Sequence, residues 1–98
     1  MTRDIALDRL RTFEPRLRAQ GVRTLYLFGS TARGEANERS DVDLLFDYDP
    51  ASRFSLFTQA DLIEELSAEI GAKVDLIAFD GLRRSFRDRV EPDLVRIF

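Results

Sequence analysis

Two aspartates separated by one residue stand at the start of an apolar stretch in the middle of the chain. Asp41 and Asp43 flank Val42, and the segment 42–48, VDLLFDY, alternates in the way that a β-strand does. Side chains two residues apart in a strand lie on the same face, so the two carboxylates project together. Like charges this close cost free energy unless a cation lies between them. The pair indicates either a metal site or a solvated acidic edge, and a D-x-D pattern alone is common.

A third aspartate, Asp75, interrupts the otherwise apolar stretch KVDLIAF. A carboxylate in a buried strand needs a partner or a metal, whereas in an edge strand it can face water. If this strand lies beside that of Asp43, then Asp75 converges with Asp41 and Asp43. Three carboxylate donors without imidazole or thiolate ligands favour Mg²⁺ or Mn²⁺. Asp47 shares the face of Asp43 but lies further along the strand, so we expect it to face solvent.

Gly29 and Ser30 follow directly after the apolar segment 22–28. A glycine lets a phosphate approach the backbone, and a serine at the start of a helical turn offers its hydroxyl near free N–H groups. The alternative is a turn glycine followed by an ordinary N-cap serine. Arg33 and Arg39 come next and are suited to hold phosphate oxygens by charge-assisted bonds. The segment lacks the G-x-x-x-x-G-K-[ST] pattern, so it is no P-loop.

The combination of these motifs is more specific than its parts. The stretch LFGSTARGEANERSDVDLL carries a G-S-x10-D-x-D signature, and a third strand with its own aspartate follows. The whole chain closely resembles the minimal nucleotidyltransferases of the DNA polymerase β superfamily. The resemblance implies a polymerase-β-like nucleotidyltransferase fold and, by position, two sets of site residues. The nucleotide would be bound by Gly29, Ser30, Arg33 and Ser40, and the catalytic metals by Asp41, Asp43 and Asp75, with Asp75 completing the metal site or accepting the acceptor's proton.

The same resemblance implies a function. Two metal ions can hold the attacking and leaving oxygens of a nucleotidyl transfer, so a chain without histidine can still be an enzyme. Stand-alone members of this family are typically paired with HEPN proteins, which are RNase toxins. We therefore expect an antitoxin that uses two Mg²⁺ (or Mn²⁺) ions to transfer AMP from ATP to a tyrosine hydroxyl of a HEPN partner in a hetero-oligomer. The alternatives are a binding module that acts by steric contact, and transfer to a small molecule such as an aminoglycoside with a second subunit.

The composition limits the class of protein. The chain has 98 residues, of which 44% are hydrophobic and 34% charged, as expected for one globular domain spanning 1–98. It contains no cysteine and no histidine, which excludes thiolate or imidazole metal sites and histidine-dependent triads. Its net charge of −3 does not attract nucleic acid. No apolar run approaches the roughly 18 residues of a membrane helix and no secretory signal is visible, so we expect a cytoplasmic protein.

Hydrophobic periodicity predicts the elements that must position these residues. Pro15 should kink or restart the first helix, and Gly21 should end it. The resulting fold class is α/β (α+β), with one small mixed sheet and helices packed on it. The expected elements are a helix over 3–20, a strand over 22–28 that is buried on both faces, a short helical turn after it, strands over 42–48 and 73–79, helices over 55–70 and 82–90, and a short strand within 93–98.

Two of the helices lead to more detailed expectations. In the 55–70 helix, the spacing predicts a buried face of Leu56, Ala60, Ile63, Ser67 and Ile70, widened by Phe57 and Leu66. In the 82–90 helix, the predicted buried stripe is Leu82, Phe86 and Val90. Arg83, Arg84 and Arg87 then form the opposite side, which is either a solvated face or a docking surface for the partner. The segment 49–58 is the next candidate for docking.

Overall fold

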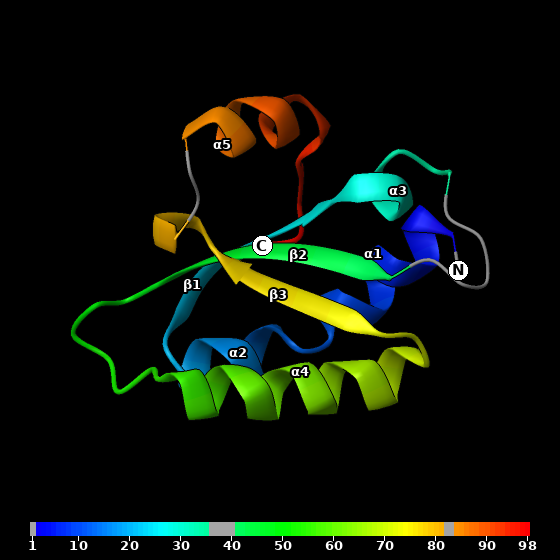
Figure 1. Ribbon diagram of the computed structural model, residues 1–98. Helices are drawn as coiled ribbons and strands as arrows, with labels where there is room; N and C mark the ends of the chain where they lie inside the picture. The colour runs from blue at the N-terminus through cyan, green and yellow to red at the C-terminus, as the bar shows by residue number, and fades with distance from the viewer. Residues whose placement is uncertain (1, 36–40, 82–83) are drawn as a thin grey trace.

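The sheet of this computed structural model is mixed, as predicted (Figure 1). The structure describes residues 2–35, 41–81 and 84–98. Four strands form one sheet in the order β3-β2-β1-β4. Strand β1 is antiparallel to both β2 and β4, whereas β2 and β3 are parallel. The strands are β1 (Val22–Phe28), β2 (Val42–Tyr48), β3 (Val74–Ala78) and β4 (Val95–Arg96).

The helices follow the predicted order along the chain. Pro15 lies in the first turn of the second helix, so the first predicted helix is indeed restarted there. Gly21 follows with φ +104° and leads into β1. Within the described residues, no helix has both the length and the apolar character needed to cross a membrane. The helices are α1 (Arg3–Arg11), α2 (Glu14–Ala19), α3 (Gly29–Ala32), α4 (Leu56–Ile70) and α5 (Arg84–Val90), with 3-10 turns η1 (Phe79–Gly81) and η2 (Glu91–Asp93).

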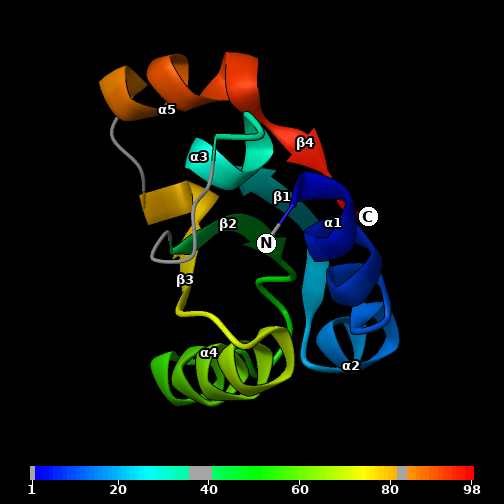
Figure 2. The same cartoon turned by 90° about the vertical axis from the view of Figure 1, so that its right-hand side faces the viewer.

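The core lies on one face of the sheet. Helices α1, α2 and α4 cover this face, and α5 stands over the opposite face (Figures 1 and 2). Val42, Leu44 and Phe46 are buried in the core, which confirms the alternation predicted for β2. Burial of each such side chain contributes about 1.5–3 kcal/mol. On the other face of β2, Leu45 is also fully buried, so both faces are covered at the middle of this strand.

The predicted buried face of α4 is wrong at its N-terminal end. The fully buried residues of α4 are Leu62, Leu66 and Ile70, which are spaced four apart. Leu56 and Phe57 are instead 82% and 85% exposed. The helix carries apolar residues around more than half of its circumference, so its spacing allowed two orientations. Packing against β3 selects the orientation that buries Leu62.

The stripe predicted for the last helix is only partly buried. Phe86 and Val90 are half-buried, and no residue of α5 is fully buried. Leu82 and Arg83 lie outside the described residues. The described contact of α5 with the sheet includes an edge-to-face pair between Phe86 and Phe28, with ring centroids 6.3 Å apart. A helix of only seven residues offers a small surface for packing, which accounts for its incomplete burial.

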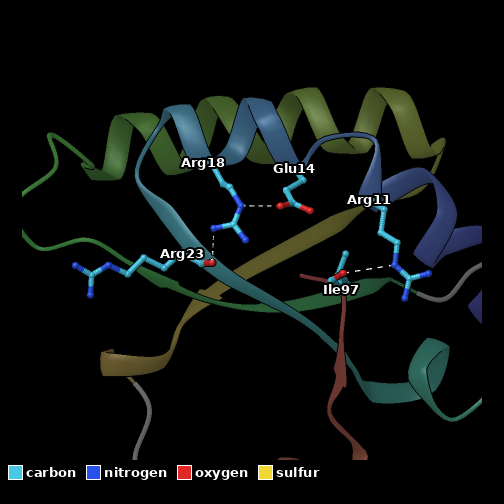
Figure 3. Close-up of polar contacts among 5 residues, drawn as sticks. All are labelled: Arg11, Glu14, Arg18, Arg23 and Ile97. Carbon is cyan, nitrogen blue, oxygen red and sulfur yellow. Dashed lines mark hydrogen bonds and ion pairs between the residues drawn. The ribbon is translucent and has the colours of Figure 1, made fainter.

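Polar contacts join the N-terminal helices to β1 and to the C-terminus (Figure 3). Arg18 of α2 donates to the Glu14 carboxylate at 2.7 Å and to the backbone carbonyl of Arg23 in β1 at 3.1 Å. Arg11 of α1 donates to the carbonyl of Ile97 at 3.4 Å. The Arg18 guanidinium also lies 4.8 Å from the ring centroid of Phe98. Strand β1 is thereby tied on one side to α2, which fixes the strand that leads into Gly29.

Candidate functional site

Asp43 and Asp75 lie side by side on neighbouring strands. They are register partners in the parallel pair of β2 and β3, so their side chains project from the same face of the sheet. Both are half-buried, while Val42 and Val74 before them are buried in the core on the other face. The condition on which the sequence argument depended, that the strand of Asp75 lies beside that of Asp43, is therefore met. Asp47, further along β2, is exposed as predicted.

Asp41 precedes β2 and makes a contact that the sequence reasoning missed. The Lys73 Nζ lies 4.0 Å from its carboxylate, and the Lys73 carbonyl accepts a hydrogen bond from the backbone N–H of Val42 at 2.8 Å. Lys73 lies two residues before Asp75, and side chains with this spacing in a strand share a face. This spacing is the sequence signal from which the contact could have been predicted. Within the described part of the chain, no three acidic side chains stand close enough together to hold a metal ion. The three-carboxylate metal site therefore stays a prediction.

The carboxylates nevertheless interact electrostatically. Burial raises the pKa of Asp43 above its ordinary value of 3.8, and the negative charges of Asp75 and Asp41 raise it further. The positive charge of Arg33 acts in the opposite direction and lowers this pKa. A half-buried carboxylate whose pKa is raised by the charges of two others is a place where a cation would relieve repulsion. The donor set of hard oxygens fits Mg²⁺ or Mn²⁺.

Gly29 is required at its position for two separate reasons. Its φ of +76° lies in the left-handed region that other residues avoid. A Cβ at this position would lie 2.6 Å from the Asp43 Oδ2, so the Asp43 side chain would have to shift to accommodate it. The turn therefore brings backbone without a side chain close to the Asp43 carboxylate. A glycine of this kind is expected where a ligand such as a phosphate approaches the backbone closely.

Ser30 is not the N-cap of α3. The cap position is Phe28, which has no side-chain capping bond, and Ser30 is the second residue of the helix. The plain capping role considered for this serine is therefore wrong. Thr31 and Ala32, the next two residues, are buried and anchor the turn. Ser40 and Arg39 lie outside the described residues.

Arg33 is held by two carboxylates at the edge of the site. Its guanidinium lies 3.1 Å from Glu35 and 3.6 Å from Asp93. These partners raise the pKa of Arg33, with the hydrogen bond to Glu35 as the largest cause. The contact with Asp93 joins α3 to η2, and nothing in the sequence pattern signalled it. Arg33 is thus near Asp43, but a phosphate would have to compete for it with Glu35 and Asp93.

Comparisons with known proteins agree with this geometry. The family described as "Nucleotidyltransferase domain" matches residues 7–97. Protein adenylyltransferase MntA of Thermococcus cleftensis is 39% identical over 77 residues, covering 79% of this chain and 76% of that protein. A solved structure described as a candidate minimal nucleotidyltransferase superposes with a TM-score of 0.83 at 29% identity, covering 97% of this chain and 95% of that one.

A solved toxin–antitoxin complex contains the same fold. It is a tri-AMPylated HEPN toxin of Shewanella oneidensis bound to an MNT antitoxin, and it matches with a TM-score of 0.71 at 14% identity. The match covers 99% of this chain and 72% of that chain. At this identity, the likeness concerns the fold alone.

Proposed function

This chain belongs to the nucleotidyltransferase domain family and is a nucleotidyltransferase, and we propose that it transfers AMP from ATP to a tyrosine hydroxyl of a HEPN-type toxin. The observation that carries the proposal is the placement of Asp43 between Asp75 and the bare backbone of Gly29. The name of the Thermococcus relative supports a protein acceptor. The AMPylated toxin in the Shewanella complex supports AMP as the transferred group and a HEPN protein as the partner.

Each site residue has a role in this reaction. Asp41, Asp43 and Asp75 would hold two Mg²⁺ or Mn²⁺ ions, which when bound neutralise phosphate charge and favour ionisation of the acceptor hydroxyl. Gly29 leaves room for the triphosphate, and the Ser30 hydroxyl donates to one of its oxygens. Ser40 and Arg33 are proposed as further nucleotide ligands.

The transfer itself is a displacement at the α-phosphorus. The tyrosine oxygen forms a bond to this phosphorus, the bond to the bridging oxygen of the β-phosphate breaks, and pyrophosphate leaves. As an alternative to completing the metal site, Asp75 is proposed to accept the hydroxyl proton, because it lies beside Asp43 on the same half-buried face of the sheet. Apart from this proton, the chain contributes positioning and charge.

The experiment uses the chain, ATP labelled at the α-phosphate, Mg²⁺ and a HEPN-type protein encoded beside its gene. We expect label on the partner, and mass spectrometry should place AMP on a tyrosine. A partner with that tyrosine changed to phenylalanine and a reaction with chelator are the controls, and both should carry no label. Neutralisation of the toxin without any label would instead support a steric antitoxin and contradict the proposal.

A further inference from the structure

A pocket of about 230 Å³ lies beside the glycine turn, and most of its walls have no role in the proposed reaction. Phe28 at the end of β1 is the register partner of Asp43, so the pocket is on the face of the sheet that carries the carboxylates. Helices α3 and α5 both lie on this side of the sheet (Figures 1 and 2). The residues that form it include Phe28, Gly29, Arg33, Phe86, Arg89 and Asp93.

The walls away from Gly29 are aromatic and cationic. The rings of Phe28 and Phe86 meet edge to face, with an angle of 87° between their planes. Phe86 is half-buried, so part of its side chain remains free to contact a ligand. The exposed Arg89 adds a planar guanidinium to the same pocket. Aromatic rings and guanidinium planes are the groups on which nucleobases stack.

Among the charged residues that line the pocket, Arg33 is already paired and Asp93 is a hydrogen-bond acceptor, which suits a neutral ring with N–H groups. The Arg33 charge is already met by Glu35 and Asp93. Asp93 itself lines the pocket, and its carboxylate would repel an anion but can accept hydrogen bonds from a base. The phosphates are therefore better placed on the Gly29 side, toward Asp43, with the base on the α5 side.

Two other pockets are less suitable for this ligand. One is lined by Tyr48 and Phe54 at the far end of β2, and at about 3.3 Å per residue Tyr48 lies roughly 17 Å from Asp43. The other is formed by charged side chains of α5 and η2, with no aromatic ring among the lining residues. The pocket at Phe86 combines aromatic walls with a direct border on Gly29.

We propose that this pocket binds the nucleobase of the donor nucleotide, stacked on Phe86 and flanked by Arg89. The inference rests on the proposed function, because it places the base relative to the phosphates of ATP. It makes Phe86 a residue that contributes to nucleotide affinity through the base and not through the phosphates. The chain would then select a nucleoside triphosphate over a bare polyphosphate by means of α5.

The test compares two ligands in the presence of Mg²⁺: α,β-methylene ATP, which carries the base, and inorganic tripolyphosphate, which does not. Calorimetry should show tighter binding of the nucleotide to the unaltered chain. Phe86→Ala should weaken nucleotide binding by about 5- to 150-fold and leave tripolyphosphate binding unchanged. Phe86→Trp keeps a stacking surface and should retain nucleotide affinity, while Phe86→Leu keeps apolar volume without a ring and should weaken it.

The matched control is Phe57→Ala, since Phe57 is 85% exposed on α4 and outside this pocket. It should change neither affinity. Equal weakening of both ligands in the Phe86 variants would overturn the inference, because it would mean that the ring only supports the phosphate site. Unchanged nucleotide affinity in Phe86→Leu and Phe86→Ala would overturn it as well. If the unaltered chain bound neither ligand, the proposed function would fail together with the inference.

Discussion

The two faces of the sheet differ in what their side chains do, although the same strands supply both. On the core face, Leu44 and Phe46 have no exposed surface and are packed beneath helices. On the other face, Asp43 and Asp75 remain half-buried, and α5 covers the sheet without burying any of its own residues completely. Along β2, residues that face the core therefore contribute to stability, and the neighbouring residue Asp43 on the other face is available for chemistry. The difference predicts that the two properties can be changed separately.

The strongest test removes the carboxylates from the site face. The double variant Asp41→Ala, Asp43→Ala should abolish transfer, because two of the proposed metal ligands are lost. Its thermal stability should be unchanged or higher, since burial and the neighbouring carboxylates disfavour the ionised form of Asp43. A transfer assay and a thermal melt measure the two properties. Transfer at the rate of the unaltered chain would contradict the assigned site.

The next largest effect should come from the core face, one residue further along the strand. Leu44→Ala should lower the free energy of unfolding by about 2–5 kcal/mol, because Leu44 is fully buried. Nucleotide affinity of the folded molecules should remain. Denaturant unfolding and calorimetry at low temperature measure both. Leu56→Ala is the matched control, since this leucine is 82% exposed and its loss should change stability by no more than about 0.5 kcal/mol.

Ser30 and Ser55 are expected to differ in role, one in nucleotide binding and the other in stability. Ser30→Ala should weaken binding of an ATP analogue by about 10- to 150-fold through one lost hydrogen bond to a charged group. Ser55 caps α4 through a capping box with Thr58, so Ser55→Ala should instead cost about 1 kcal/mol of stability. Calorimetry and thermal melts on both variants separate the roles. Loss of stability without loss of affinity in Ser30→Ala would remove this serine from the nucleotide site.

The arginine side of α5 is the proposed docking surface for the partner. Arg84 and Arg87 are exposed, and the Arg87 guanidinium lies 5.6 Å from the ring centroid of Phe79. Changing both to glutamate should slow transfer to the partner about tenfold or more at low salt, because the field that guides association is reversed. Binding of free ATP should not change. If partner binding survives the reversal at physiological salt, the docking surface is elsewhere. The exposed Leu56 and Phe57, within the segment 49–58, are then the residues to change.

The smallest expected effect is the pH dependence of stability in the absence of metal. The pKa of Asp43 is raised in the folded chain, so the native state binds this proton more tightly than the unfolded state does. The stabilisation is present below the ordinary pKa of 3.8 and is lost as the pH rises through the raised native value. The variant Asp43→Asn should not lose stability in this way as the pH rises, because its side chain does not titrate. Urea unfolding at a series of pH values should therefore show the variant gaining stability relative to the unaltered chain as the pH rises from 3.8 through the raised native pKa. A difference in the free energy of unfolding that stays constant with pH would contradict this prediction.

Local patterns predicted most of the secondary structure. The bounds of β1 and β2 are those expected from residues 22–28 and 42–48, and the restart at Pro15 is as expected. The orientation of α4 was not predictable, because Leu56 and Leu62 are equally apolar and their burial depends on where the helix meets β3. The incomplete burial of Phe86 was missed for a related reason, since periodicity reports which face is apolar but not how closely it is covered.

In the candidate site, too, some relations between residues were predictable from the sequence and others were not. By itself the sequence predicted that Asp41 and Asp43 project together, and it determined that Gly29 and Ser30 follow a strand, because these relations involve neighbouring residues. Only the tertiary structure decided that Asp75 lies beside Asp43 and that Gly29 leaves no room for a side chain next to this carboxylate. It also decided that Lys73 is the partner of Asp41 and that Asp93 is a partner of Arg33. These relations depend on which strands pair and in what register, and residues far apart in the chain are brought together only when the core beneath them is packed.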